Sequence, residues 1–425
     1  MNTLPRRTFL RTATAAGAVA LTGVSAGEPA GSRKIKLGLI GCGWYGLVDA
    51  KAALHAGGAE VVGICDVDSE HLSTTAAELE KLQGSRPQSF KLYEELLKMP
   101  GLEAVIIATP PHWHALQFIA ACERGLDIYC EKPLAYDVRE GRAMVDAAQK
   151  CGRVIQIGFQ RRHAAGFGEA RKYLQEGHAG PIICADAQIH YTAGTLDPTP
   201  QPPPATLDWE LWCGPGPLIP YSPQVGHKNW RLEKTSGHGH LVDWGIHLID
   251  TARWMLGAGA PRTVSAAGGL YRLKGKITTP DVLSVHFEFD PCPLTWNHRI
   301  WGAQEYDPET SNGLSFFGEK ETVFCTDNKW VVIPRGKDQP RQVHEAKSDA
   351  GGLHMAEFLE AVRTRQQPSC SISEAHLSTT AVKLAMISYD TGAKIVWDAQ
   401  AEQIPGNPEA AKLLKRDYRA PWQHP

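Results

Sequence analysis

The sequence predicts an α/β fold: a parallel sheet covered by helices on both faces, followed by a second domain with a large, mostly antiparallel sheet. Residues 34–159 alternate short apolar runs with helix-like segments, and a glycine-rich turn follows the first apolar run. Beyond residue 284, strand-like runs follow one another without helices between them. Strands separated by helices form parallel sheets, whereas consecutive strands pair antiparallel.

In chain order, periodicity and turn signals predict each element of the first domain. We expect strands at 34–41, 59–68, 102–109, 126–133 and 153–159, with helices over 42–57, 70–82, 92–98, 114–124 and 138–150. The second domain is expected to contain helices over 166–176, 242–257, 352–363 and 373–391, and strands at 181–191, 284–290, 314–320, 321–327 and 329–336. The proline-rich stretch 196–217 is expected to be a surface loop with aromatic anchors.

The turn GCGWYG follows the first expected strand and has G-x-G-x-x-G spacing. Gly41 permits the tight turn, Gly43 lets backbone N–H groups approach a pyrophosphate, and Gly46 allows close packing of helix on strand. Asp66 ends the second strand, where its carboxylate binds ribose hydroxyls and repels a 2′-phosphate. The sequence therefore predicts a Rossmann dinucleotide-binding domain that prefers NAD to NADP. We expect the cofactor to contact Gly41, Gly43, Trp44, Tyr45, Gly46 and Asp66.

Two more strand ends are expected at the same edge of the sheet, because ligands of such sheets lie outside the carboxyl ends of the strands. Thr109 and Pro110 follow the third strand, with His114 nearby, and Glu131 and Lys132 end the next strand in CEKP. These residues are expected to contact the cofactor. A lysine at a strand end is commonly a solvated edge charge. At the mouth of a cofactor site, it can instead be held near a reacting hydroxyl.

These motifs resemble the glucose–fructose oxidoreductase/inositol dehydrogenase (Gfo/Idh/MocA) family. The similarity runs from about Lys34 to the end of the chain and covers the glycine turn, ATPPHWH, EKPLA, GFQRRH, DWGIHLID and the closing AAKLLKRDYRAPW. The resemblance implies that Lys132 assists proton transfer at the substrate. It also implies a homo-oligomer formed through the C-terminal sheet.

Asp243 and His247 are four residues apart in an expected helix, so they share one face on successive turns. The spacing alone is also compatible with a surface pair or a satisfied core histidine. Two considerations favour a catalytic role: Lys132 is expected to have no partner of its own, and the family resemblance points the same way. We therefore expect Lys132, His247 and Asp243 to form a catalytic group. Lys132 and His247 would handle the hydroxyl proton while Asp243 orients one of them.

Three histidines near this helix depart from the run of glycines that relatives often carry there. His238 and His240 would share one side of an extended chain, and His227 lies upstream. Histidines beside a carboxylate can bind zinc, but this spacing does not match the familiar zinc patterns. We expect no metal and interpret these histidines as hydrogen-bonding groups for substrate or cofactor, with metal ligation left open.

The leading interpretation is an NAD-dependent oxidoreductase that transfers hydride between nicotinamide and a hydroxyl of a sugar, cyclitol or related polyol. The alternative is a glycosidase or lyase on the same fold that oxidises a ring carbon transiently, eliminates, and reduces again. A sugar-binding relative without turnover is disfavoured by the intact Lys132, Asp243 and His247. A net charge of -2 over 425 residues, without a basic block, argues against a nucleic-acid partner.

The N-terminal segment has the features of an export signal. Arg6 and Arg7 precede a mildly apolar, alanine-rich stretch, and residues 24–26 offer a signal-peptidase site. The stretch is shorter than the roughly 20 residues of a membrane span. The pattern resembles a twin-arginine signal and predicts export to the periplasm, with no membrane attachment after cleavage. The predicted organisation is 1–32 signal and linker, 33–157 NAD-binding domain, 158–406 substrate and oligomerisation domain, and 407–425 tail along the surface.

Overall fold

The computed structural model describes residues 33–190, 194–299, 301–302, 312–336 and 338–425. The predicted export signal lies outside these residues. The chain divides into a unit of residues 1–33 and a unit of residues 34–425, and every element below belongs to the second unit. In the described part of the chain, no helix combines the length and the apolar character needed to cross a membrane.

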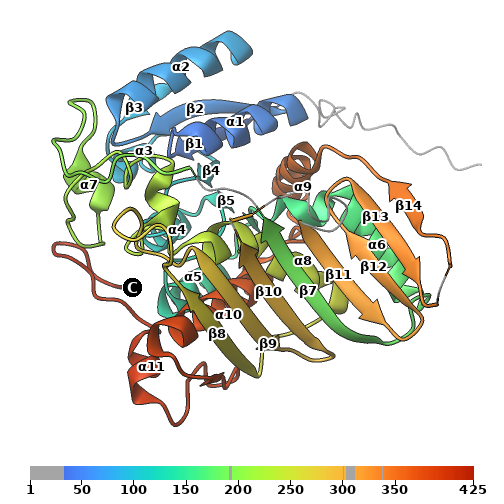
Figure 1. The fold of residues 1–425 in the computed structure, drawn as a ribbon. Helices are drawn as coiled ribbons and strands as arrows, with labels where there is room; N and C mark the ends of the chain where they lie inside the picture. Colours follow the sequence, from blue (N-terminus) through green and yellow to red (C-terminus); the bar gives the residue numbers. More distant parts are fainter. Residues whose placement is uncertain (1–32, 191–193, 300, 303–311, 337) are drawn as a thin grey trace, which may run out of the picture. The chain divides into compact units, whose positions relative to one another are not determined.

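The first sheet is parallel and contains six strands among the described residues, in the order β3-β2-β1-β4-β5-β6 (Figure 1). The strands are β1 (Ile35–Ile40), β2 (Ala59–Cys65), β3 (Gln88–Phe90), β4 (Ala104–Ile107), β5 (Asp127–Cys130) and β6 (Ile155–Ile157). The strand order reverses between β1 and β4, where sheets of this type bind nucleotides. The sequence did not predict β3, because its three residues carry no apolar alternation.

Helices connect these strands as the periodicity predicted: α1 (Trp44–Ala56), α2 (Ser69–Gln83), α3 (Tyr93–Leu96), α4 (His114–Glu123) and α5 (Val138–Cys151). Asp68 caps α2 by accepting a hydrogen bond from the Glu70 N–H, and Asp137 caps α5 in the same way through Glu140. Such caps satisfy donors that a helix start leaves unpaired.

The second sheet is mostly antiparallel and contains nine strands in the described chain, in the order β14-β13-β12-β11-β7-β10-β9-β8-β15. They are β7 (Ile182–His190), β8 (Thr263–Gly269), β9 (Val282–Glu288), β10 (Pro293–Arg299), β11 (Gly313–Gly318), β12 (Glu321–Cys325), β13 (Lys329–Pro334), β14 (Gln342–Glu345) and β15 (Ile395–Val396). Only β7 and β10 pair in parallel within this described sheet. The predicted fold class is therefore confirmed.

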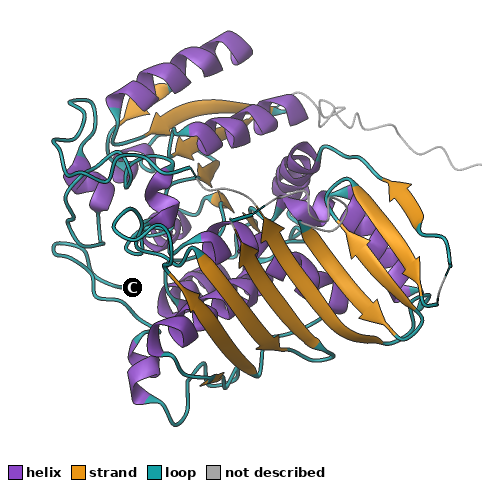
Figure 2. Ribbon diagram, in the orientation of Figure 1, coloured by secondary structure: helices purple, strands orange, loops and turns teal. Residues whose placement is uncertain are grey.

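Helices cover one face of the second sheet, as Figure 2 shows, while the other face has no helix over it in the described chain. The second domain contains α6 (Ala165–Gln175), α7 (Trp209–Cys213), α8 (Ile246–Leu256), α9 (Ala350–Thr364), α10 (Ile372–Thr391) and α11 (Pro408–Lys412). In β9, Leu283, Val285 and Phe287 are buried, whereas Ser284 and His286 are exposed. The period of two is that of a sheet packed on one face.

Two segments expected at the surface contain buried parts. The proline-rich stretch includes α7, whose Trp209 and Trp212 are buried and stacked with ring centroids 4.5 Å apart. In the C-terminal tail, the Arg416 Nε donates to the buried carboxylate of Glu140 at 2.8 Å, and Leu414 is buried. Aromatic packing and a buried ion pair therefore attach both segments to the body of the unit.

The motifs GFQRRH and DWGIHLID meet through a buried ion pair. The Arg162 guanidinium donates to both carboxylate oxygens of Asp250, at 2.7 and 2.8 Å, and the two side chains are 3% and 1% exposed. Ser378 of α10 donates to the same carboxylate. This network joins the segment after β6 to α8 and α10, and so positions the helix that follows Asp243.

Candidate active site

The glycine turn brings the start of α1 against the end of β4. Gly41 has a φ of 95°, and a Cβ there would lie 2.8 Å from the backbone of Ala108 and Thr109. A Cβ on Gly46 would lie 1.9 Å from the Gly41 carbonyl oxygen. Only glycine fits both positions. Gly43 is the N-cap of α1 and contributes no capping side chain, so N–H groups of the first turn remain available for an anion.

A cavity of about 540 Å³ opens beside this turn. Its lining includes these predicted residues: Gly41, Gly43, Trp44, Tyr45, Asp66, Thr109, Pro110 and His227. Gly46, His114, Glu131 and Lys132 are not among the described residues that line it. The sequence prediction missed other lining residues, among them His71, Trp212, Trp230, Arg231 and Trp422. No motif links these residues, because they come from segments far apart in the sequence.

Asp66 is held firmly at the edge of the cavity. Its Oδ2 accepts a hydrogen bond from the Cys42 N–H at 2.7 Å, and its Oδ1 accepts one from the Asp68 N–H at 2.9 Å. His71 Nδ1 lies 3.7 Å from Oδ2, and the interaction with the Asp66 carboxylate raises the pKa of His71. A fixed carboxylate beside an uncapped helix start fits the ribose and pyrophosphate of a dinucleotide without a 2′-phosphate.

Lys132 extends from the end of β5 to Asp243 in the second domain. Its Nζ donates to the Asp243 carbonyl oxygen at 2.8 Å and to the Oδ1 at 3.0 Å. The expectation that Lys132 has no partner is therefore wrong. Its partner, Asp243, lies 111 positions further along the chain, so local sequence patterns do not reveal the contact.

Asp243 also pairs with Arg231. The Arg231 Nε lies 3.0 Å from its Oδ2, and the aspartate side chain is only 7% exposed. Burial alone would raise the pKa of Asp243, but the charges of Lys132 and Arg231 outweigh it and lower the pKa below its ordinary value. The carboxylate is therefore ionised at neutral pH. It holds two cations at once, one of which lines the cavity.

Asp243 and His247 do not lie on one regular helix. Residues Leu241–Gly245 form a single π-helical turn, and α8 begins at Ile246. Such turns are rare and frequently occur at functional sites. Asp243 contacts Lys132 and Arg231, whereas the His247 ring packs edge-on against Phe159 with centroids 6.1 Å apart.

His247 is a neutral imidazole at neutral pH. Burial lowers its pKa well below the ordinary value, and the positive charge of Lys132 lowers it further. Its Nδ1 has no hydrogen-bond partner among the described residues. Because Nδ1 is buried, only the neutral state of the ring bears on proton transfer: a neutral imidazole can accept a proton.

Behind Lys132, Glu131 belongs to a buried polar network. Its Oε1 accepts a hydrogen bond from the Gln160 Nε2 at 2.7 Å, and its Oε2 accepts one from the Lys132 N–H at 3.2 Å. Burial raises the pKa of Glu131 to about 7. His114 is also buried, with its ring nitrogens 2.8 and 2.9 Å from the carbonyl oxygens of Thr109 and Pro133. Both side chains thus support the strand ends that carry Thr109 and Lys132.

The three additional histidines lie in three different places. His227 lines the cavity and lies 3.5 Å from Asp68. His238 stacks on Tyr136, whereas His240 packs against His298 with ring centroids 4.5 Å apart. The φ of His238 is 71°, so the chain is not extended there and the two rings diverge. Burial lowers the pKa of His238 and His240 to about 4.

Family models match three stretches of the chain. Residues 35–159 match an oxidoreductase family with an NAD-binding Rossmann fold, residues 218–324 match the GFO/IDH/MocA C-terminal domain, and residues 339–424 match an oxidoreductase-family C-terminal alpha/beta domain. The first match establishes residues 35–159, which contribute the glycine turn and Asp66 to the cavity, as an NAD-binding domain.

Among curated proteins, the chain is 31% identical over 230 residues to levoglucosan dehydrogenase from Pseudarthrobacter phenanthrenivorans, which is 53% of this chain and 52% of that one. It is 29% identical over 226 residues to scyllo-inositol 2-dehydrogenase (NAD(+)) from Bacillus subtilis. That alignment covers 53% of this chain and 55% of the relative. The chain thus spans about half the length of these curated relatives.

Solved structures share the fold over a larger part of the chain. A levoglucosan dehydrogenase in complex with NADH and levoglucosan superposes with a TM-score of 0.67 at 20% identity, covering 85% of this chain and 99% of that one. An aldose–aldose oxidoreductase from Caulobacter crescentus, complexed with glycerol, superposes with a TM-score of 0.67 at 19% identity. The superposition covers 86% of this chain and 100% of that one. At these identities the similarity establishes the fold.

Proposed function

The chain belongs to the Gfo/Idh/MocA oxidoreductase family, and we propose that it is an NAD-dependent dehydrogenase acting on a CH–OH group of a sugar, cyclitol or related polyol. The observation that carries the proposal is the pairing of Lys132 with Asp243 at the end of β5, with a neutral His247 in the adjoining helix. The names of the curated relatives, a levoglucosan and an inositol dehydrogenase, support this substrate class.

The residues of the turn and of β2 would hold the cofactor. The N–H groups at the start of α1 would bind its pyrophosphate, and Asp66 would accept hydrogen bonds from the adenosine ribose. Bound NAD supplies the hydride acceptor.

Lys132 is suited to bind the reacting oxygen. An ammonium group has three N–H donors, and two of them go to the carbonyl and the carboxylate of Asp243. The third remains for the substrate hydroxyl oxygen, where it stabilises negative charge that develops as the carbon is oxidised. Because Asp243 is itself held by Arg231, the direction of the ammonium group is set before substrate binds.

His247 would accept the hydroxyl proton. Its low pKa keeps the ring unprotonated, so it can take the proton as the C–H bond transfers its electron pair in the hydride. The hydroxyl thereby becomes a carbonyl, with one proton on the imidazole and one hydride removed. The dehydrogenase names of the relatives favour this net oxidation over transient oxidation in a glycosidase or lyase.

The test is a stoichiometry measurement on the purified full-length protein. Supplied with NAD and a panel containing levoglucosan, scyllo-inositol, myo-inositol and simple aldoses, it should form NADH and one oxidised product in equal amounts with at least one compound. Formation of NADH with none of these would contradict the proposed class. Cleaved or eliminated product in large excess over NADH would show internal redox chemistry instead.

We also propose that the protein is exported through the twin-arginine route and assembles through the second sheet. Arg6 and Arg7 with the following apolar stretch support export. The helix-free face of the second sheet carries small and polar side chains, including Ser284 and His286 on β9, which suits contact with a second copy. Multi-angle light scattering would measure the assembly, and a monomer at micromolar concentration would contradict it.

A further inference from the structure

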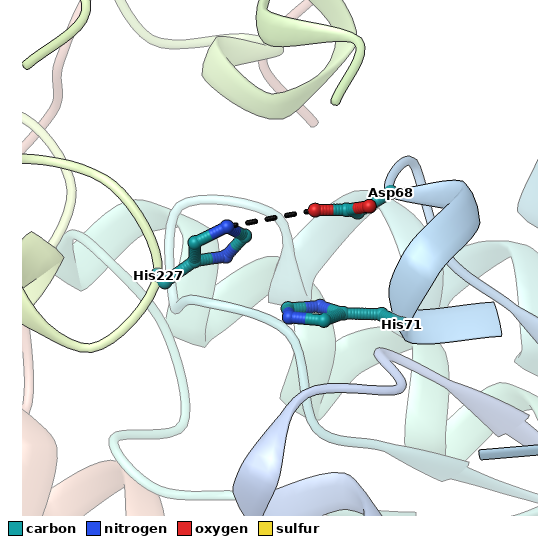
Figure 3. A group of neighbouring side chains, drawn as sticks. All are labelled: Asp68, His71 and His227. Atoms are coloured by element: carbon teal, nitrogen blue, oxygen red, sulfur yellow. Dashed lines mark ion pairs between the residues drawn. The ribbon is translucent and has the colours of Figure 1, made fainter. Parts of the chain in front are cut away.

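Asp68, His71 and His227 converge at one edge of the cavity, with their polar ends directed toward a common space (Figure 3). Asp68 caps α2 and His71 lies in its first turn, while His227 comes from the long segment between β7 and the π-helical turn. Each offers a ligand atom within 4.8 Å of the other two. The cluster therefore joins the two halves of the unit through side chains that metal ions prefer.

The separation of the ligand atoms suits an ion better than a hydrogen bond. His227 Nε2 and Asp68 Oδ2 are 3.5 Å apart, whereas a hydrogen bond of this type spans about 2.7–3.2 Å. Two atoms that each lie about 2.0–2.1 Å from a zinc ion, at a tetrahedral angle, are about 3.3–3.4 Å apart. These two atoms are therefore already spaced like neighbouring ligands of one ion.

Asp68 can serve as a ligand without losing its role as a helix cap. Its Oδ1 accepts the hydrogen bond from the Glu70 N–H at 2.9 Å, and its Oδ2 faces His227. The carboxylate is nearly buried, at 2% exposure for the residue. A buried anion of this kind favours a cation beside it.

The rings of His71 and His227 are also oriented so that each can bind an ion. His227 has a φ of 46°, a left-handed conformation that is uncommon for a residue with a Cβ. The ring reaches Asp68 from this backbone conformation and lies 4.6 Å from the His71 ring, centroid to centroid. His71 Nδ1 lies 3.7 Å from the Asp66 carboxylate. The Nδ1 side of the ring therefore faces a carboxylate, and Nε2 is left for an ion.

We propose that Asp68, His71 and His227 bind one divalent transition-metal ion of the Zn²⁺ type. Two imidazole nitrogens and one carboxylate oxygen are ligands for zinc, cobalt or nickel, and three protein ligands leave a further position open toward the cavity. The ion attaches the segment at His227 to the start of α2. That segment continues to Arg231, which lines the cavity and holds Asp243, so the ion orders one wall of the cofactor site.

Direct binding tests this site without reference to catalysis. Full-length protein, freed of metal by a chelator and kept free of NAD, is titrated with Co²⁺ while its visible absorption is recorded, and Zn²⁺ is then added as a competitor. We expect one equivalent of Co²⁺ with the intense bands of a tetrahedral site, displaced by one equivalent of Zn²⁺. His71→Ala and His227→Ala should each weaken binding at least about tenfold, since each removes one of three protein ligands.

Two further variants separate ligation from folding. Asp68→Asn keeps a good helix cap but removes the charged ligand, so it should weaken Co²⁺ binding while far-UV circular dichroism stays unchanged. His178→Ala is the matched control, because His178 is exposed and pairs with Glu176 away from the cluster. It should bind Co²⁺ like the parent protein.

Failure of the parent protein to bind Co²⁺ more tightly than a His71→Ala/His227→Ala double variant would overturn the proposal. So would loss of NADH affinity in the histidine variants with no metal uptake by the parent, since the histidines would then serve only the cofactor.

Discussion

The Lys132 ammonium donates hydrogen bonds to both the backbone carbonyl and the carboxylate of Asp243, at 2.8 and 3.0 Å. Lys132 stands at the end of a parallel strand, and Asp243 lies in a π-helical turn of the second domain. The position of the lysine therefore depends on both domains.

Replacing Lys132 with alanine should lower kcat about 10²–10⁴-fold, the range for groups that assist proton transfer. NADH affinity should survive, because Asp66 and the glycine turn hold the cofactor. Steady-state kinetics and NADH fluorescence titration measure the two effects separately. Lys150→Ala, on the exposed end of α5, is the control. A raised KM with unchanged kcat would instead identify Lys132 as a binding group.

His247→Ala should show the same separation of rate from NADH affinity. If Lys132 and His247 act on one hydroxyl, the double variant should lose much less activity than the product of the two single losses. Multiplicative losses would mean that the two groups act independently. Single-turnover rates on all four proteins decide between these outcomes.

Asp66→Asn should weaken NADH binding about tenfold and narrow the preference for NADH over NADPH. Hydrogen bonds to a charged group contribute about 1.5–3 kcal/mol, and the carboxylate repels a 2′-phosphate. The N–H groups of Cys42 and Asp68 bind different oxygens of the Asp66 carboxylate, so asparagine keeps an acceptor for only one of them, and circular dichroism of the variant must show an intact fold. Dissociation constants for both cofactors test this, with the exposed Asp417→Asn as control. If the ratio of the two dissociation constants were unchanged, Asp66 would not be the residue that selects NAD over NADP.

Asp250→Ala should reduce the free energy of unfolding by about 3–5 kcal/mol, because it leaves the buried Arg162 without its bidentate partner. Glu409→Ala, which breaks an exposed pair with Lys412, should change it by less than about 1 kcal/mol. Urea denaturation followed by circular dichroism compares the two. If the two variants lost equal free energies of unfolding, burial would not strengthen the Arg162–Asp250 pair.

Stability should fall as the pH drops below the ordinary histidine value of about 6.5. Burial lowers the pKa of several described histidines to about 3 or 4: His112, His114, His238, His240 and His354. Below pH 6.5 these histidines bind protons in the unfolded chain but stay neutral in the folded chain. Lowering the pH therefore favours unfolding until it reaches the pKa values of the folded state. Groups whose pKa is raised act in the opposite direction: Asp49, Glu131, Glu140, His71 and His424. They are outnumbered, because burial also lowers the pKa of four further histidines: His163, His227, His247 and His298.

Thermal unfolding at intervals from pH 7.5 to pH 4.5 measures this dependence. The midpoint should change little from pH 7.5 to about pH 7 and decline from pH 6.5 to pH 4.5, and His178→Ala, an exposed site, should leave this slope unchanged. A midpoint that is constant from pH 6.5 to 4.5 would contradict the assignment of buried, neutral histidines.

Changing Arg6 and Arg7 to lysine should retain the protein in the cytoplasm of its host without altering the fold, because the twin-arginine route requires the paired arginines. Fractionation and immunoblotting of the parent and the variant measure this. Confinement of the parent protein to the cytoplasm would contradict the export proposal.

The sequence predicted the elements whose signals are local. The glycine turn and the apolar periodicity act within a few residues of one another, so α1, α2 and the core strands of the first sheet were recognisable. Strand β8 ends in small residues and glycines and β10 begins with proline, so both lack the usual strand signal. The helix α7 was hidden by the prolines around it.

By itself, the sequence determined the fold class, the NAD-binding turn and the residue types able to move a proton. Only the tertiary structure decided which of them meet: Lys132 with Asp243, Arg231 with the same carboxylate, and His227 with Asp68 rather than with His238 and His240. The physical reason is range. Hydrogen bonding and hydrophobic periodicity leave a pattern over one or two turns. These contacts join residues 12 to 159 positions apart and depend on how loops, sheets and helices pack.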